Sequence, residues 1–92
     1  MEDMNETKTW HVDIFIGEHE GETHAEARLR PNGDVTLAGT GTARLNPIDR
    51  DVPEIGEEIA AARALLDLAE HLLHAAADDI EGVTNEKVTL GH

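Results

Sequence analysis

Four side chains in the second half of the chain are spaced as metal ligands could be. Asp67, His71, His74 and Asp78 follow one another at intervals of four, three and four residues, which on a helix places them along one flank. Carboxylate and imidazole groups at such intervals can share a divalent ion such as zinc. The same flank would also serve as an ordinary solvated helix surface, and the chain has no HExxH motif. We expect the structural role and assign no metal ligand or cofactor.

Groups suited to covalent catalysis are scarce. The chain has no cysteine and no tyrosine, and its threonines, carboxylates and histidines form no motif that pairs a nucleophile with a base. The segment Gly39-Thr40-Gly41-Thr42 is rich in glycine. It lies inside an alternating segment, however, and not between a strand and a helix, where a phosphate-binding loop belongs. We therefore expect no enzymatic activity and no catalytic residues.

Three arginines form the one clustered basic feature of the chain. Arg28, Arg30 and Arg44 all fall on the outer face of the sheet predicted below, where they could contact phosphate groups of a nucleic acid. The alternative is that they pair with carboxylates on the same surface. Trp10 and Phe15 are the only aromatic residues, so platforms for stacking bases are scarce. We treat the three arginines as a candidate interaction patch.

Charge narrows the choice of partners. The chain has 20 acidic and 7 basic residues, a formal net charge of −13. A field of this sign repels phosphate backbones, so autonomous nucleic-acid binding is not expected, whereas solubility and a basic protein partner both fit it. No apolar run approaches the ~20 residues that span a bilayer, and the first residues are acidic, unlike a secretion signal. These features predict a soluble, cytoplasmic protein without membrane contact.

The hydrophobic pattern predicts three strands followed by one long helix, an α+β fold. Apolar and polar residues alternate over 9–16, 22–30 and 34–45, as in strands with one face in the core. The predicted connections are a loop over 17–21 and a turn over 31–33. Residues 1–8 are polar without periodicity and are expected to be disordered, and residues 9–92 are expected to form a single domain.

The strand pattern also predicts a register for the second hairpin. The apolar faces coincide if Leu29 lies opposite Val35 and Ala27 opposite Leu37. That pairing leaves a three-residue loop with Gly33 in the left-handed conformation. Small inward-facing residues then form a shallow trough that receives the helix: Ala25, Ala27, Gly39 and Gly41.

Signals for a helix start follow the third strand. Asn46-Pro47 ends the strand, because proline has no N–H for the ladder and disfavours helical geometry in the residue before it. Asp51 is the expected N-cap, with Glu54 three residues later completing a capping box. Pro53 falls in the first turn, where its missing N–H costs little. The helix is expected to run to about Ile80.

This helix has more apolar surface than one small sheet can cover. One line of apolar residues follows alternating intervals of four and three: Ile55, Ile59, Ala62, Leu66, Ala69, Leu73, Ala76 and Ile80. Leu65, Leu68 and Leu72 widen it beyond a coiled-coil seam over about 40 Å. We expect a homodimer. The expected core comprises Trp10, Ile14, Leu29, Leu37, Ile59, Leu66 and Leu73.

The end of the chain offers one route to that dimer. Residues 87–90, Lys-Val-Thr-Leu, are predicted to form a short fourth strand. We expect this strand to be exchanged onto the sheet edge of the partner, because an unpaired edge is a liability.

Several short segments together resemble a known family. They are Glu18–Gly21, Ala27–Leu29, Ala43–Pro47, Asp49-Arg50, Val52–Gly56, Ala62–Leu65 and Asp79–Glu81. In these the chain resembles a family of small actinobacterial proteins of unknown function described as dsRBD-fold-containing, whose mycobacterial members are linked to the dormancy response. The resemblance covers roughly residues 10–85, and the part from Ala43 to Leu65 is the most specific. It implies a cytoplasmic, dimeric α+β domain similar in shape to bacterial ribosome-hibernation factors, without established catalytic residues.

Two functions are therefore expected, from different arguments. The resemblance implies a non-enzymatic stress or dormancy protein that acts on ribosomes, or on ribosome-associated proteins, in a hibernation-like role. The composition indicates the alternative, an acidic protein-interaction module that binds a basic protein partner.

Overall fold

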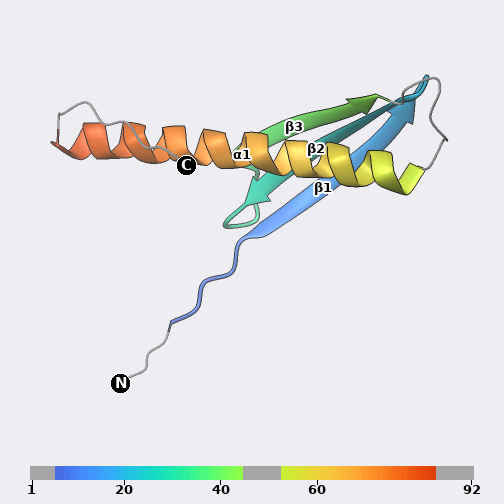
Figure 1. Ribbon diagram of the computed structural model, residues 1–92. Helices are drawn as coiled ribbons and strands as arrows, with labels where there is room; N and C mark the ends of the chain where they lie inside the picture. The colour runs from blue at the N-terminus through green and yellow to red at the C-terminus, as the bar shows by residue number, and fades with distance from the viewer. Residues whose placement is uncertain (1–5, 45–52, 85–92) are drawn as a thin grey trace.

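The computed structural model describes residues 6–44 and 53–84. Three strands, β1 (His11–His19), β2 (Glu22–Arg30) and β3 (Leu37–Arg44), form an antiparallel sheet in the order β1-β2-β3. One helix, α1 (Pro53–Thr84), crosses one face of this sheet, and its C-terminal part extends beyond the strands (Figure 1). The predicted α+β architecture is confirmed.

The first hairpin is tighter than predicted. Residues 17–21 were expected to form a loop, but β1 continues to His19, and Gly17 and Glu18 remain in the ladder opposite β2. Only Glu20 and Gly21 make the turn, with φ angles of 51° and 77°. Two successive positive φ angles are the signature of a type I′ turn, whose twist matches that of the strands. The ladder therefore runs up to the turn, and the loop prediction was wrong.

The second hairpin has the predicted faces in a different register. Leu29 pairs with Leu37, two residues away from the predicted partner Val35. A shift of two preserves which side chains face inward, so matching apolar faces could not exclude it. The connection is correspondingly longer, from Pro31 to Thr36, and Gly33 has the expected positive φ, 96°. Val35 consequently lies outside the ladder and is 51% exposed.

Close contact between α1 and β3 defines the core. A Cβ atom added to Gly39 would meet the backbone of Ala64 and Leu68, and one added to Gly41 would meet the backbone of Ala60 and Ala64. The helix therefore rests directly on the predicted trough. The buried cluster consists of Ala25, Ala27, Leu29, Ala43, Ala60, Ala64 and Leu68.

This packing corrects the predicted core. Leu29 is buried and Leu37 packs against the cluster, but Trp10, Ile14 and Ile59 are 55%, 38% and 40% exposed. Leu66 is 64% exposed and Leu73 only half-buried. The reason is that the glycines on β3 let the helix backbone approach closely along Ala60, Ala64 and Leu68, so α1 packs on the sheet through this line, which is buried. Its four-and-three line points the opposite way.

Other predictions meet the limits of the described residues. α1 begins at Pro53 with Glu54 as the acidic residue of its first turn, and it runs past Ile80 to Thr84. The expected N-cap Asp51 and the expected strand over 87–90 lie outside the described residues. Within the described part of the chain, no helix is long and apolar enough to cross a membrane.

Candidate interaction surface

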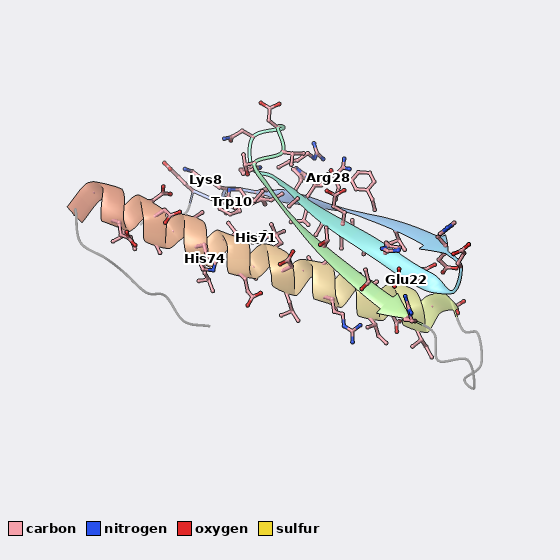
Figure 2. All side chains as sticks on the ribbon, turned by 90° about the horizontal axis from the view of Figure 1, so that it is seen from above. Lys8, Trp10, Glu22, Arg28, His71 and His74 are labelled. Atoms are coloured by element: carbon pink, nitrogen blue, oxygen red, sulfur yellow. The ribbon has the colours of Figure 1, made fainter. Side chains whose placement is uncertain are left out.

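On the outer face of the sheet, Arg28 contacts both an aromatic ring and a carboxylate. Arg28 lies on the side of the sheet away from α1 (Figure 2). Its Nε and Nη2 atoms donate hydrogen bonds to Glu26 Oε1 at 3.0 and 2.8 Å. Its guanidinium carbon lies 4.3 Å from the centroid of the Phe15 ring, an arrangement that stabilises by about 0.5–1 kcal/mol at exposed sites. The contact with Phe15 ties β2 to β1 on the outer face, whereas the bonds to Glu26 lie within β2.

The other two predicted arginines are also paired. Arg30 donates from Nε to Asp13 Oδ2 on β1. Arg44 donates from Nη2 to Glu22 Oε2 at 3.1 Å. The second oxygen of Glu22 lies 2.9 Å from Nε2 of His24. All three arginines of the candidate patch are therefore bound to a carboxylate of the same sheet.

The structure brings two of these arginines together and leaves the third apart. Arg28 and Arg30 lie next to each other on the outer face of β2. Arg44 pairs across the ladder with Glu22, which is six residues from Arg28 along β2, or about 20 Å at 3.3 Å per residue. The outer face thus has two small, separately neutralised positions instead of one basic cluster.

The free edge of β3 is closed by side chains of α1. Arg63 donates from Nη1 to the carbonyl oxygen of Thr42 at 2.7 Å. The backbone N–H of Thr40 donates to Asp67 Oδ2 at 2.9 Å, and Nδ1 of His71 lies 2.7 Å from a carbonyl oxygen two residues earlier on β3. Residues at i, i+4 and i+8 of one helix flank thereby bind successive outward-pointing backbone groups. Such cover prevents another strand from pairing with this edge.

This arrangement accounts for part of the suggested metal-binding flank. Asp67 and His71 are held by β3, and Nε2 of His71 also lies 3.5 Å from Asp67 Oδ1. His74 and Asp78 are exposed on the same helix, and Figure 2 shows His71 and His74 on α1. Among the described residues, no three histidine, aspartate or glutamate side chains are grouped as metal ligands. The contacts support the structural interpretation of Asp67 and His71.

The inner face of β1 is an apolar surface that the alternating sequence pattern predicted to lie in the core. Trp10 and the inward-facing side chains of β1 form what we call the β1 strip, and their exposed fractions lie between 38% and 55%: Trp10, Val12, Ile14 and Ile16. α1 packs on β3 and β2 and scarcely touches β1. A helix about 10 Å wide covers two strands spaced about 4.8 Å apart, but not three. The glycines of β3 were the sequence signal for this exposed surface, because they fix the helix over β3, at the edge of the sheet opposite β1.

A second apolar surface lies on the side of α1 that faces away from the sheet. We call it the outer seam, and it consists of Ile55, Ile59, Ala62, Leu66, Ala69 and Leu73. Ile55, Ile59 and Leu66 are 53%, 40% and 64% exposed. At about 100° per residue, Leu66 lies about 200° around the helix from the buried Ala64. α1 is therefore apolar on two opposite sides, of which its own sheet covers one.

Comparison with known proteins places this architecture among mycobacterial relatives. The model of the Rv2632c-like family matches residues 8–89. Uncharacterized protein MT1780 of Mycobacterium tuberculosis (strain CDC 1551 / Oshkosh) is 54% identical over 81 residues, which cover 88% of this chain and 85% of the relative. Uncharacterized protein Rv2632c of M. tuberculosis (strain ATCC 25618 / H37Rv) is 46% identical over 82 residues, covering 89% and 87%. The crystal structure of Rv2632c matches with a TM-score of 0.80 at 43% identity, over 91% of this chain and 99% of that one.

Proposed function

The chain belongs to the Rv2632c-like family, and we propose that it is a non-enzymatic, cytoplasmic binding protein whose acidic surface engages a basic protein partner. The observation that carries this proposal is the pairing of all three outer-face arginines with carboxylates: Arg28 with Glu26, Arg30 with Asp13 and Arg44 with Glu22. Their charge is neutralised locally, so the field around the molecule is dominated by its excess of acidic groups, a net charge of −13. Such a field attracts basic partners and speeds their association.

A second candidate function is a role on the ribosome in dormancy. The resemblance to a dsRBD-fold family with dormancy-linked members supports it, and so does one feature of the outer face. Arg28 stacked on Phe15 offers a guanidinium and a ring of the kind that RNA-binding proteins use for phosphates and unstacked bases. Phosphate groups would have to displace Glu26 and Asp13, however. We therefore place this function behind the first.

Ribosome co-sedimentation of the full-length chain, at low and at physiological salt, separates the two. Association that survives physiological salt and falls in the double variant Arg28→Ala/Arg30→Ala supports the ribosome role. Arg44→Ala is the matched control, because this arginine is also ion-paired but lies at the other end of the sheet. Absence from all ribosomal fractions, together with recovery of a basic protein whose binding weakens as salt rises, supports the protein-interaction role.

A further inference from the structure

We propose that the outer seam of α1 packs on the β1 strip of a second copy of the chain, so that a twofold dimer covers both surfaces. The inference is independent of the proposed function. It assigns the apolar surfaces that the fold leaves exposed, and it names the side chains that meet across the interface.

The two surfaces cannot cover each other within one copy. Arg63 and Asp67 fix one flank of α1 to the edge of β3, and Ala60 and Ala64 lie buried on the sheet. The outer seam consequently points away from the sheet to which the β1 strip belongs. Only a second molecule can bring a seam to a strip.

The two surfaces match in kind and in length. The seam is a ridge of branched side chains, and the strip is the apolar face of a strand, the two partners that helix-on-sheet packing requires. The whole seam from Ile55 to Leu73 is about 27 Å long at 1.5 Å per residue, and its part from Ile59 to Leu73 is about 21 Å long. From Trp10 to Ile16 the strip is about 20 Å long at 3.3 Å per residue.

The exposed apolar area is of the size that a dimer buries. Eight large side chains on the strip, the seam and the adjoining flank are 38–64% exposed: Trp10, Val12, Ile14, Ile16, Ile55, Ile59, Leu65 and Leu66. At roughly 150–200 Å² for a large apolar side chain, their exposed area is on the order of 600 Å². Stable interfaces bury about 800 Å² per partner, whereas contiguous apolar patches beyond a few hundred Å² are rare on monomers. Alanines of the seam and a polar rim supply the remainder.

In a twofold dimer the contact between an outer seam and a β1 strip occurs twice, once for each copy. Each helix then lies between its own β2 and β3 on one side and the partner's β1 on the other, and the two helices run side by side between two sheets. The helix flank opposite Arg63 carries Leu65, which is 42% exposed, and Leu72. This flank faces the neighbouring helix in the dimer, which accounts for a leucine that the monomer leaves exposed.

The first test is the oligomeric state of the full-length chain by light scattering and sedimentation. We expect a dimer at micromolar concentration. Leu66→Glu should raise its dissociation constant about tenfold or more, the effect typical of a residue at the centre of an interface. Val83→Glu is the matched control, because Val83 lies on the same helix outside the seam and is 86% exposed. A monomeric wild type, or a dimer that Leu66→Glu leaves unchanged, would overturn the proposal.

The second test locates the contact directly. The chain has no cysteine, so a mixture of two single variants, Ile14→Cys and Leu66→Cys, should form a disulfide-linked pair of one copy of each under mild oxidation. A mixture of Phe15→Cys with Leu66→Cys should not, because Phe15 points to the outer face. This test does not depend on whether Leu66→Glu folds. Equal cross-linking in the two mixtures contradicts the assignment.

Trp10 provides a third readout without any substitution. It is the only tryptophan of the chain, it lies where the chain enters β1 (Figure 2), and it is 55% exposed. Dimerisation should cover it, so quenching of its fluorescence by acrylamide should fall as protein concentration rises through the dissociation constant. Quenching independent of concentration, over a range in which light scattering reports dimerisation, would exclude the β1 strip from the interface.

Discussion

β1 and β3 are the two edge strands of one sheet, yet the protein treats them in opposite ways. β3 has its inner face covered by α1 and its free edge bound by Arg63, Asp67 and His71. β1 has an uncovered apolar inner face, and it is held to its own sheet by the ladder to β2 and by outer-face contacts. The β3 edge is thereby covered by the chain itself, while β1 keeps an exposed apolar face of the kind found at interfaces. The difference follows from two glycines, which place the helix over β3.

The largest expected effect comes from filling the space that these glycines leave. Gly41→Ala places a methyl group against the backbone of Ala60 and Ala64, which cannot move without lifting the helix. We expect a loss of about 3 kcal/mol or more in the free energy of unfolding, measured by urea denaturation. Gly17→Ala on β1 is the control, because nothing lies within 4 Å of the added atom, and it should change stability by less than about 1 kcal/mol. Similar losses of unfolding free energy in both variants would contradict the claim that the helix is packed closely on β3 but not on β1.

The protected edge of β3 should depend measurably on Asp67. Asp67→Ala removes the acceptor of the Thr40 N–H and a neighbour of His71. We expect a loss of about 1–2 kcal/mol, as for a partly exposed hydrogen bond to a charged group. Asp78→Ala, an exposed aspartate on the same helix, should be close to neutral in the same urea titration. Equal effects would mean that the edge contacts contribute no stability.

The unprotected side should respond to ionic strength. Each copy has a net charge of −13, so the proposed dimer forms against electrostatic repulsion, while its contacts are apolar. Screening at physiological salt, where the Debye length is about 8 Å, weakens that repulsion. The dissociation constant, measured by sedimentation at several salt concentrations, should therefore fall a few-fold between low and physiological salt. A rise with salt would indicate that ion pairs hold the copies together.

The smallest expected effects concern the outer face. Arg28→Ala removes both an ion pair and the contact with Phe15, which helps to hold β1, and should cost about 1 kcal/mol in unfolding experiments. Arg44→Ala removes only an ion pair at a side chain that is 80% exposed and should be nearly neutral. If Arg44→Ala proves the more costly of the two, the ring contact has no stabilising role.

Sequence reasoning recovered the elements of this fold and missed how they pack. Periodicities of two and 3.6 predicted three strands and one long helix, and Gly39 and Gly41 predicted the trough that receives it. The helix, however, has one line formed by Ala60, Ala64 and Leu68 and another that contains more large apolar residues, and hydrophobicity alone favours the latter. Close approach decides otherwise, because Gly39 and Gly41 let the helix backbone at Ala60, Ala64 and Leu68 rest directly on β3. The misplaced core around Leu66 and the unrecognised β1 strip both follow from that one choice.

The arginine patch shows a different limit. Alternation correctly placed Arg28 and Arg44 on one face of the sheet, but two residues on the same face can still lie far apart along the strands. The observed register places Arg44 opposite Glu22, six residues from Arg28 along β2, and the predicted register would have placed it opposite residue 20, farther still. A shared face therefore did not imply that these arginines lie close together. Pairing with Glu26 and Glu22 depends on rotamers, which no pattern of residue types encodes.

The hydrogen bond from the Thr40 amide to Asp67 makes the exchange of this edge-strand amide proton depend on the docking of the helix. Outward-pointing amides of an edge strand normally exchange with deuterium through small local openings. This one can exchange only when Asp67 withdraws. Arg63 and His71 hold the same flank to the same strand, so undocking of the helix frees this amide, and so does rotation of the Asp67 side chain alone. The exchange rate of this single amide therefore sets a lower limit on the free energy of helix undocking, a quantity that separates loss of the helix layer from unravelling of the sheet beneath it.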